Sequence, residues 1–493
     1  MTRTSTPPDD QGQPPRITVI GAGYLGATHA ACMAALGFQV LGVDVDSERV
    51  DRLGRGEVPF HEPGLPELLS TQVAEGRLRF TTSLALAAEF GDTHFVCVGT
   101  PELPRGYGAD LSQVVTVIEM LGPLLTRPCL VVGKSTVPVG TAEPLARRLA
   151  ELSPVGEHAR LAWNPEFLRE GHGIQDTLRP DRLVFGVTDD VAERALRRVY
   201  APLLADTPER PATPVVVCDL PTAELVKVAA NAYLATRLSF VNLVADVCEA
   251  SGADVVPLTR ALGLDPRIGD RFLGAGLGYG GGCLPKDLRA FTARAEQLGA
   301  GRGVELLQAV DQINVERRSR TVALVREELG GEVTDARVAV LGAAFKPHSD
   351  DVRDSPALTV AADLHLHGAR VAVHDPHALT NARRELPTVD YADSAYEAAT
   401  GADIVLHLTE WPEYAALDPD RLRRLVRRPT LLDARNTLDR DHWTRAGWSV
   451  RSLGRPRHPG SPAPGSLQHR RAIGTGHHGG AGSPTVGGAA RET

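Results

Sequence analysis

The sequence lacks paired cysteine spacings and long hydrophobic runs. Its six cysteines are scattered and no C-x-x-C motif occurs, which indicates reduced thiols in a cytosolic protein and no structural zinc site. No run of about 18 apolar residues is present, so no membrane span is expected. Residues 1–15 are polar and proline-rich and lack the apolar core of a signal peptide. The cysteines are Cys32, Cys97, Cys129, Cys218, Cys248 and Cys283.

Positive charge is also in short supply. The 493-residue chain has a formal charge of -8, with 42% hydrophobic and 23% charged residues. This composition is typical of a globular protein of two to four domains and argues against a partner bound through a nucleic-acid backbone. The 16 histidines show no metal-ligand spacing, so no metal is expected.

Apolar side chains are scarce in the last part of the chain. From Gly454 to Thr493 the residues are mainly Gly, Pro, Ser, His and Arg. Such a segment cannot bury enough surface to offset the entropy of ordering it, so 454–493 and 1–15 are both expected to be disordered. A chain that ends near Ser452 is therefore expected to fold normally.

A dinucleotide-binding pattern opens the folded part. An apolar strand at 16–20 leads into GAGYLG at 21–26, a helical stretch follows, and a second strand at 39–43 ends at Asp44. Gly21 permits the tight turn, Gly23 admits a pyrophosphate, and Gly26 lets the helix pack on the strand, with its N-terminus toward the phosphates. Asp44 accepts from a ribose 2′-hydroxyl and repels a 2′-phosphate with no basic partner beside it, which predicts NAD rather than NADP.

Two further segments complete the predicted organisation. Strand-like runs at 94–98, 130–133, 161–163 and 183–187 extend the first sheet across a domain at 16–210. A helix without internal proline or glycine at 222–252 predicts a dimer spine within a central domain at 211–330. Strands at 337–341, 370–374, 403–408 and 430–432 predict a domain at 331–453, whose turn has one glycine, Gly342, and binds something other than NAD. The predicted fold is α/β: two Rossmann-like doubly wound domains joined by a long central helix or helical domain.

The stretch GYGGGCLPKD at 278–287 carries the clearest chemical signal. Glycines let the backbone approach a ligand, and a nearby ammonium, Lys286, is expected to lower the pKa of the Cys283 thiol, so Cys283 is a candidate nucleophile. A buried, inert cysteine is the alternative. On the predicted helix at 222–252, Lys227 and Asn231 share one face with Glu224, and a solvated surface is the alternative there.

The motifs, in chain order, resemble those of the UDP-glucose/GDP-mannose dehydrogenase family from about Arg16 to Gly454. Such enzymes oxidise a nucleotide hexose by four electrons with NAD, and the resemblance implies UDP-glucose as substrate and UDP-glucuronate as product. The motifs are GAGYLG at Gly21, VGTP at Val98, STVPVGT at Ser135, NPEFLREG at Asn164, DPRIGDRF at Asp265, YGGGCLPKD at Tyr279, AFKPHSDDVRDSP at Ala344 and DARN at Asp433.

The resemblance also implies a mechanism and its residues. Cys283 captures the C6 aldehyde as a thiohemiacetal, a second hydride transfer gives a thioester, and water releases the acid. Lys227 and Asp287 position water and stabilise oxyanion charge, Glu166 is the acid/base of hydrolysis, and Thr136 and Asn231 hold water and substrate. Arg267 reaches the neighbouring subunit's site in a homodimer or larger homo-oligomer. The implied substrate residues are Glu166, Phe167, Leu168, Arg169, Lys227, Asn231, Arg267, Tyr279, Gly280, Gly281, Lys346 and Arg435; the implied NAD residues are Gly21, Gly23, Tyr24, Leu25, Gly26, Asp44, Arg49, Thr100, Thr136, Glu170, Lys286 and Arg353.

Several alternatives remain open. Gly282 stands where the family has serine, and Ala275-Gly276-Leu277 replaces a proline-containing segment, so the fine substrate contacts differ. The substrate alternatives are GDP-mannose and UDP-N-acetylmannosamine. A two-electron β-hydroxyacid-type dehydrogenase needs no thiol, and a catalytically dead sensor would lack part of the catalytic set. For Arg49, Glu170 and Arg353 plain surface charge is the alternative, and Asp350, Asp351 and Asp354 are expected to form a hydrated acidic turn.

Overall fold

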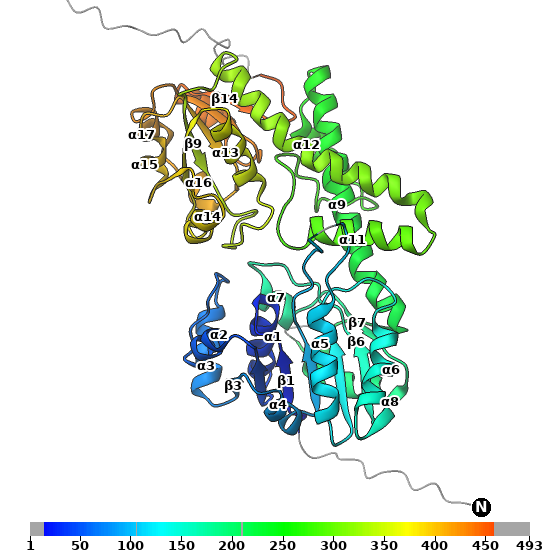
Figure 1. The fold of residues 1–493 in the computed structure, drawn as a ribbon. Helices are drawn as coiled ribbons and strands as arrows, with labels where there is room; N and C mark the ends of the chain where they lie inside the picture. The colour runs from blue at the N-terminus through cyan, green and yellow to red at the C-terminus, as the bar shows by residue number, and fades with distance from the viewer. Residues whose placement is uncertain (1–13, 105, 209–210, 458–493) are drawn as a thin grey trace, which may run out of the picture.

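Figure 1 shows two lobes, each built on a sheet, with long helices along one side. This computed structural model describes residues 14–104, 106–208 and 211–457. The disorder predicted for 1–13 and 458–493 lies outside the described residues. Among the residues described, no helix is long and apolar enough to cross a membrane.

The N-terminal lobe holds an eight-stranded sheet in the order β3-β2-β1-β4-β5-β6-β7-β8. Its strand pairs are parallel except for the single antiparallel contact between β6 and β7. The strand order reverses beside β1, which is where ligands bind in doubly wound sheets. The strands are β1 Ile17–Ile20, β2 Val40–Val43, β3 Leu78–Thr81, β4 Thr93–Val96, β5 Cys129–Gly133, β6 Ala159–Trp163, β7 Leu183–Gly186 and β8 Val215–Cys218.

Helices cover both faces of this sheet because successive strand residues point to opposite sides. Val19 packs in a core with α1, α3 and α8, whereas Ile20 packs in a second core with α4, α5 and α6. The predicted doubly wound arrangement is confirmed. The helices are α1 Tyr24–Ala35, α2 Ser47–Gly54, α3 Leu65–Ala74, α4 Leu84–Phe90, α5 Ser112–Leu121, α6 Ala142–Leu152, α7 Gly173–Leu178 and α8 Asp190–Leu204.

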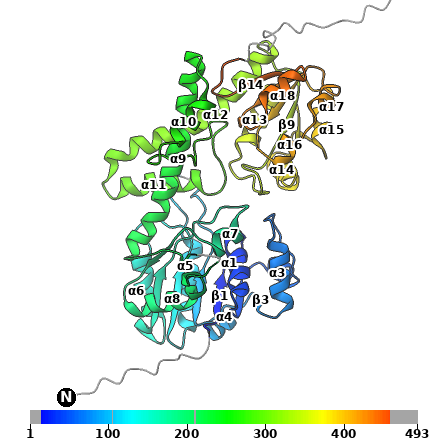
Figure 2. The same ribbon diagram turned by 180° about the vertical axis from the view of Figure 1, so that it is seen from behind.

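A 32-residue helix, α9 Leu220–Ser251, runs from the N-terminal lobe, which is the lower lobe in Figures 1 and 2, along the C-terminal lobe, which is the upper lobe. The side chain of Asp219 accepts from the Thr222 amide at its start, and Gly252 ends it with a left-handed φ of 78°. The long helix predicted at 222–252 is thus confirmed within two residues. Helices α10 Val255–Gly263, α11 Leu284–Gln297 and α12 Val304–Leu329 pack beside it.

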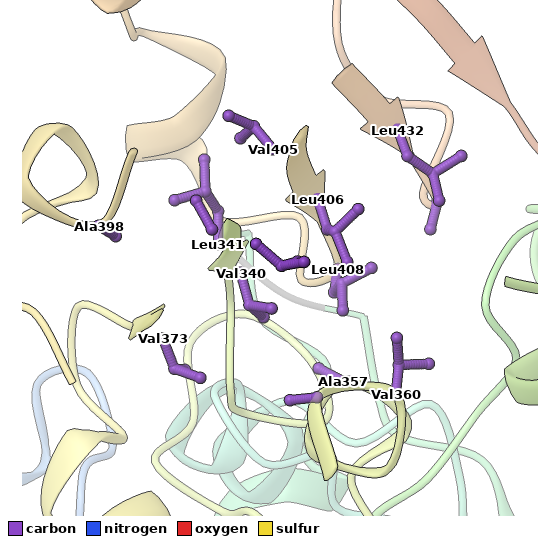
Figure 3. Packing of buried hydrophobic residues seen from close by; sticks show 14 of the residues in the cluster. Val340, Leu341, Ala357, Val360, Val373, Ala398, Val405, Leu406, Leu408 and Leu432 are labelled. Carbon is purple, nitrogen blue, oxygen red and sulfur yellow. The ribbon is translucent and has the colours of Figure 1, made fainter. Parts of the chain in front are cut away.

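The C-terminal lobe is a six-stranded parallel sheet in the order β11-β10-β9-β12-β13-β14. Figure 3 shows Val340, Leu406 and Leu432 of this sheet in the same buried core as Val360 of α13. A second Rossmann-like sheet was predicted and is present. The elements are β9 Arg337–Leu341, α13 Pro356–Leu366, β10 Arg370–His374, α14 Leu379–Glu385, β11 Asp390–Tyr391, α15 Ala395–Ala399, β12 Ile404–His407, α16 Pro412–Ala415, α17 Pro419–Arg423, β13 Thr430–Asp433, α18 Arg440–Arg445 and β14 Ser449–Ser452.

The disorder predicted from Gly454 onward is wrong for residues 454–457. The Gly454 amide donates to Glu249 Oε1 (2.8 Å) and its carbonyl accepts from the Val255 amide (3.0 Å). Arg455 pairs with Asp254 at 3.0 Å, and Arg457 pairs with Glu328 of α12. Composition misled here because these residues dock through hydrogen bonds and ion pairs rather than through apolar burial.

The sequence predicted a hydrated acidic turn after β9, and this prediction is wrong, because the carboxylates have protein partners. Asp351 pairs with Arg353 at 2.6 Å, Asp354 pairs with Arg318 of α12 at 2.8 Å, and Asp350 accepts from Asn381 at 3.2 Å. The three carboxylates instead bind groups brought close by the fold.

Candidate active site

The GAGYLG turn has the close approaches that its glycines were predicted to permit. A Cβ on Gly21, which has φ +93°, would lie 2.8 Å from the Val98 nitrogen, and one on Gly26 would lie 1.7 Å from the Gly21 oxygen. A Cβ on Gly23 would meet nothing within 4 Å. The turn therefore leaves open space at the N-terminus of α1, which fits the pyrophosphate of a dinucleotide.

Asp44 lies at the end of β2 with both carboxylate oxygens engaged. Its Oδ2 accepts from the Ala22 amide at 2.8 Å and its Oδ1 from the Asp46 amide at 3.0 Å. Arg49 Nη1 lies 3.1 Å from Asp44 Oδ2, so the expectation that no basic group stands beside Asp44 is wrong. Asp46 caps α2 and directs its first turn so that Arg49 reaches back. Plain surface charge does not describe Arg49.

Tyr24 of the same turn leads to a residue that the sequence did not indicate. The Tyr24 hydroxyl donates to Glu62, whose carboxylate also accepts from the amides of Gly171 (2.6 Å) and Gly173 (2.7 Å). Burial and this carboxylate raise the pKa of Tyr24 well above its ordinary value. Glu62 is 2% exposed and ties the dinucleotide turn to the loop that carries Glu166.

Cys283 lies at the N-terminus of α11 and has an exposed surface. Groups from both lobes surround it, and a Cβ on the preceding Gly282 would lie 2.4 Å from Cζ of Arg353. Arg353 thus fills the space that a serine at position 282 would need. The alternative that Cys283 is a buried core cysteine is therefore excluded.

The expectation that a nearby ammonium lowers the pKa of Cys283 is wrong. Crowding by the surrounding protein and the Asp287 carboxylate raise the pKa of this thiol to about 12, while Lys227 opposes them. The Lys286 ammonium does not lower the pKa of Cys283 as expected. Its Nζ is bonded to the Asp287 carboxylate, at 2.7 Å from Oδ1. The resting residue is therefore a protonated thiol that must lose its proton before it attacks.

Two buried polar pairs lie beside the thiol. Lys227 Nζ lies 2.9 Å from Glu166 Oε1, and Asn231 donates to Asp287 Oδ2 at 2.7 Å. Burial acts to lower the pKa of Lys227, but Glu166 and the other anionic groups around it outweigh burial and raise it. The alternative of a solvated helix face is excluded, because Lys227 is 5% and Asn231 8% exposed.

Glu224, the acidic residue of that helix face, has a structural role. Glu224 accepts from the amides of Gly140, Thr141 and Ala142 at 2.7, 3.0 and 2.6 Å. These amides begin α6, so Glu224 caps that helix and fixes the segment that contains Thr136.

Thr136 joins the same centre from the N-terminal lobe. It lines a small pocket together with Val228, Lys286 and Asp287. Its carbonyl accepts from the Thr100 hydroxyl at 2.7 Å. The structure thus brings Thr100 and Thr136, two residues predicted to serve the site, close to the first turn of α11.

The NPEFLREG loop presents its side chains in different directions. The Leu168 amide donates to Glu166 Oε2 at 2.6 Å, which fixes this carboxylate toward Lys227. The Phe167 ring lies under Arg182, with 3.7 Å between the guanidinium carbon and the ring centroid. Arg169 pairs with Asp176 at 2.6 Å and so points away from Glu166 and Lys227.

Glu170 faces the upper lobe. It accepts from Ser349 at 2.9 Å and pairs with Arg353 at 3.3 Å. Burial and the neighbouring Asp351 raise the pKa of Glu170 to about 7. Burial lowers the pKa of Lys346, although Glu170 acts against this. Glu170 and Arg353 thus form a contact between the lobes rather than plain surface charge.

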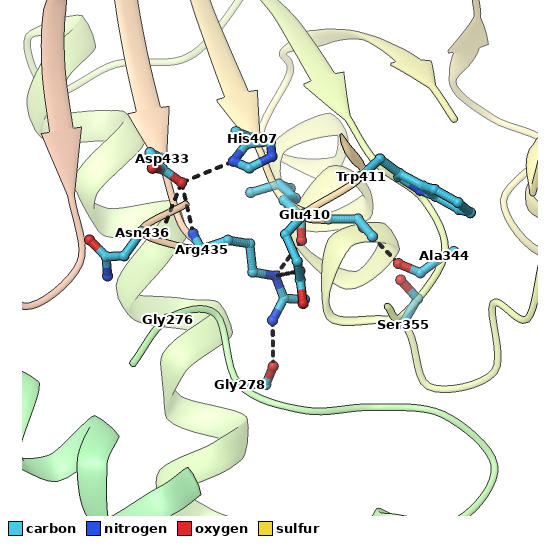
Figure 4. Close-up of polar contacts among 12 residues, drawn as sticks. Gly276, Gly278, Ala344, Ser355, His407, Glu410, Trp411, Asp433, Arg435 and Asn436 are labelled. Atoms are coloured by element: carbon cyan, nitrogen blue, oxygen red, sulfur yellow. Dashed lines mark hydrogen bonds and ion pairs between the residues drawn. The ribbon is translucent and has the colours of Figure 1, made fainter. Parts of the chain in front are cut away.

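The cysteine loop at 275–281 has no regular structure, and side chains from both sides bind its backbone. Asn314 of α12 accepts from the Tyr279 amide at 2.8 Å and donates to its carbonyl at 3.0 Å. From the upper lobe, Arg435 donates to the Gly278 carbonyl at 2.8 Å (Figure 4). Asn436 donates to the Ala275 carbonyl at 3.1 Å.

The DARN turn that supplies these two side chains is itself fixed by Asp433. This carboxylate pairs with His407 Nδ1 at 2.9 Å and accepts from the amides of Arg435 and Asn436 at 3.0 Å (Figure 4). Burial acts to raise the pKa of Asp433, but His407 and the donated hydrogen bonds lower it. Arg435 Nη2 is buried without a partner among the described residues, which leaves a donor available for a ligand.

Arg267 is not brought to the Cys283 centre of its own chain. Its side chain is 87% exposed and pairs with Asp265 at 2.6 Å. An intrachain ion pair thus exists, yet the guanidinium stays accessible to another molecule. Within the described part of the chain, no group of three or more His, Cys, Asp or Glu residues has the arrangement of a metal site.

Two doubly wound sheets on either side of one exposed cysteine are the arrangement expected of a dinucleotide-dependent dehydrogenase. Three models of the UDP-glucose/GDP-mannose dehydrogenase family match this chain: the NAD binding domain at 15–204, the central domain at 221–316 and the UDP binding domain at 339–440. The chain belongs to this family, and the resemblance read from its motifs is confirmed.

Relatives agree over nearly the whole length. UDP-glucose 6-dehydrogenase of Rhizobium meliloti is 42% identical over 444 residues, with 90% of this chain and all (100%) of the relative covered. The Pseudomonas aeruginosa protein of the same name is 41% identical, with 90% and 98% covered. A solved UDP-glucose dehydrogenase from Pyrobaculum islandicum has a TM-score of 0.80 at 37% identity, with 89% and 98% covered.

Proposed function

We propose that the chain catalyses the NAD-dependent four-electron oxidation of UDP-glucose to UDP-glucuronate through Cys283. The observation that carries this proposal is one thiol flanked by the Lys227–Glu166 and Asn231–Asp287 pairs, between an NAD binding and a UDP binding domain. A two-electron dehydrogenase has no use for such a thiol. A catalytically inactive nucleotide-sugar sensor would be expected to lack one or more of Cys283, Lys227, Asn231, Glu166 and Asp287.

NAD, when bound, accepts a hydride from C6 in each of two oxidations. Between them, the Cys283 sulfur adds to the C6 aldehyde and the thiol proton passes to the aldehyde oxygen, which becomes the hydroxyl of a thiohemiacetal. After the second hydride has left C6, the thioester is attacked by a water molecule whose proton passes to Glu166. The C–S bond then breaks, which restores the thiol and gives the carboxylate.

Lys227 and Asn231 are proposed to stabilise the oxyanion of both tetrahedral intermediates. A buried ammonium and a fixed amide cost little reorganisation when negative charge develops. Lys227 also holds Glu166, so the same cation links thiohemiacetal formation to hydrolysis. Thr136 is proposed to position the water or the sugar.

The nucleotide is proposed to bind between the upper lobe and the cysteine loop. Lys346 and the unpartnered Nη2 of Arg435 supply charge for phosphate oxygens, and Tyr279 with Gly280 and Gly281 lines the sugar side. Phe167, Leu168 and Arg169 are proposed as neighbours of the sugar. We propose that NAD is bound by the turn from Gly21 to Gly26 and by the side chains of Asp44, Arg49, Thr100, Glu170, Lys286 and Arg353.

We further propose a homodimer in the cytoplasm. One face of α9 exposes Tyr233 (63%), Phe240 (53%) and Val247 (60%) at helical spacing. Such a stripe is suited to packing against the same helix of a second copy. Arg267 would then enter the site of the other subunit.

The decisive experiment is an NAD-reduction assay with a panel of nucleotide sugars. UDP-glucose is expected to exceed UDP-N-acetylmannosamine, UDP-N-acetylgalactosamine and GDP-mannose by at least tenfold in kcat/KM. The panel includes N-acetylhexosamines because a Pyrococcus horikoshii protein titled UDP-D-ManNAc dehydrogenase shares the fold, with a TM-score of 0.77 at 26% identity. A clear preference for another sugar would overturn the substrate assignment.

A further inference from the structure

Lysine is rare in this chain, and its positions are informative. Of 53 Lys and Arg residues, only Lys134, Lys227, Lys286 and Lys346 are lysines. Lys227, Lys286 and Lys346 are the ammonium groups of the proposed site. Elsewhere the chain uses arginine for its exposed positive charge. The fourth lysine, Lys134, has no role in the mechanism above.

Lys134 follows β5 and is buried directly behind the NPEFLREG loop. It is 7% exposed. Its Nζ donates to Asn164 Oδ1 at 3.0 Å and lies 3.4 Å from the Tyr200 hydroxyl. Asn164 is two residues before Glu166, and its own side chain donates to the Val184 carbonyl at 2.9 Å. Lys134 thus holds the turn from which Glu166 projects.

The cation has only neutral hydrogen-bond partners. No carboxylate lies within ion-pair distance of Lys134 among the residues described. A buried ammonium without a paired carboxylate destabilises a fold. Burial lowers the pKa of Lys134, Cys97 and Glu166 act to raise it, and Lys227 acts with burial. The charged or titratable groups that face Lys134 are His29 of α1, Cys97 after β4, Glu166 after β6, Tyr200 of α8 and Lys227 of α9.

We propose that Lys134 is a positioning residue of the active site, which braces the Asn164–Glu166 turn and places a positive charge behind the Glu166 carboxylate. The inference rests on the proposed function, in which Glu166 takes a proton from water. Lys227 also pairs with Glu166, but it is shared with the proposed oxyanion, whereas Lys134 serves the Asn164–Glu166 turn only. Lys134 stays behind the loop and compensates Glu166 throughout the cycle.

The test is the pH profile of Lys134→Met with saturating NAD and UDP-glucose. The acid limb of kcat is expected to move up by about one pH unit, because Glu166 protonates more readily, with little change in KM. The matched control is Tyr200→Phe, which removes a hydroxyl from the same Asn164 oxygen without removing charge. Its acid limb should stay in place. An unmoved limb in Lys134→Met overturns the proposal.

Thermal unfolding separates this role from a purely structural one. Lys134→Met should unfold at an equal or higher temperature than the parent, because Asn164 Oδ1 keeps the Tyr200 hydroxyl at 2.6 Å and a buried charge is gone. A lower unfolding temperature with an unmoved acid limb would mean that Lys134 only supports the fold. If Lys134→Met does not fold, Lys134→Gln carries the same tests, because it keeps the bond to Asn164 without the charge.

A third measurement needs no substrate, so it can fail independently of the proposed function. Urea unfolding of Lys134→Met, Glu166→Gln and the double variant forms a double-mutant cycle. Lys134→Met should gain more stability when Glu166 is already neutral, because the attraction between the two charges is then absent. Equal gains in both backgrounds overturn the link between them. If the parent enzyme oxidises no nucleotide sugar, the proposed function fails and this cycle alone decides on Lys134.

Discussion

At the residue scale, the charges around Cys283 set its reactivity, and they do not simply activate it. Asp287 and the surrounding protein keep the thiol protonated, while Lys227 favours the thiolate. A resting thiol with a pKa of about 12 is protected from oxidation and alkylation at neutral pH. Reactivity then depends on proton removal once substrate is bound.

The alkylation rate of Cys283 by iodoacetamide should report this balance. Because the pKa is raised, the rate should climb steadily from pH 7 to pH 10 without a plateau. Asp287→Asn should speed alkylation at pH 8 by about tenfold or more, and Lys227→Met should slow it. Cys283→Ala is the control that removes the labelled site. A plateau near pH 8 in the parent enzyme would contradict the assigned environment.

Cofactor choice is also decided by single residues. Asp44 should exclude NADP because its carboxylate repels the 2′-phosphate. If Asp44 were neutral, the guanidinium of Arg49 beside it could bind that phosphate. Asp44→Asn is therefore expected to lower kcat/KM for NAD and to raise it for NADP. Asp44→Asn combined with Arg49→Ala should lose the NADP gain. Comparable kcat/KM for the two cofactors in the parent enzyme would refute the role of Asp44.

At the element scale, the sequence predicted the interior strands of both sheets and missed the four edge strands β3, β8, β11 and β14. β1, β4 and β5 are apolar runs flanked by turns, and such runs must be buried. β3 reads Leu-Arg-Phe-Thr and β14 reads Ser-Val-Arg-Ser, and neither has an apolar run. Each forms by pairing with the strand before it, β3 with Leu78 opposite Val40 and β14 with Ser449 opposite Thr430, and a local pattern does not contain that information.

The polar residues that fix the site were hidden for the same reason. Glu62 lies in a loop and reads as a solvated acid, yet its partners are 38 and 109 residues away in sequence. Asn436 and Ala275 are separated by 161 residues. By contrast, Cys283 was predicted from its own motif, and Lys227 and Glu166 were predicted from the family resemblance that the motifs carry.

The segment after β14 gives a test at this scale. A chain that ends at Ser452 loses the fully buried Leu453 and the contacts of Gly454, Arg455 and Arg457. It should be less stable by about 2 kcal/mol or more, seen as a fall of several degrees in Tm. The matched chain that ends at Arg457 should keep the Tm of the full-length protein. Equal Tm for both truncated chains would show that these contacts contribute nothing.

At the scale of the whole molecule, the active site is assembled from all three domains. The lower lobe supplies Glu166 and the dinucleotide turn, α9 and α11 supply Lys227, Asn231 and Cys283, and the upper lobe fixes the cysteine loop through the DARN turn. The upper lobe thus fixes the backbone of the loop that precedes Cys283. A second subunit is the further part that we propose, with Arg267 as the residue that crosses.

Complementation tests the crossing. Cys283→Ala and Arg267→Ala homodimers should each be nearly inactive, because each lacks one group at both sites. After the two chains are unfolded and refolded together, one site of a mixed dimer carries both changes and the other carries neither. Activity should recover toward one working site per mixed dimer. No recovery in proven heterodimers would place Arg267 in its own chain's site.

Cys283 is proposed to hold the substrate covalently between the two oxidations, so that no aldehyde leaves the enzyme. The direct measurement is the ratio of NADH formed to UDP-glucose consumed, with trapping of free aldehyde by a hydrazine reagent. The account predicts two NADH and one UDP-glucuronate per UDP-glucose, no trapped aldehyde, and no acid formation by Cys283→Ala that still binds NAD. One NADH per sugar with aldehyde released, or uronate made at a comparable rate by Cys283→Ala, would contradict it.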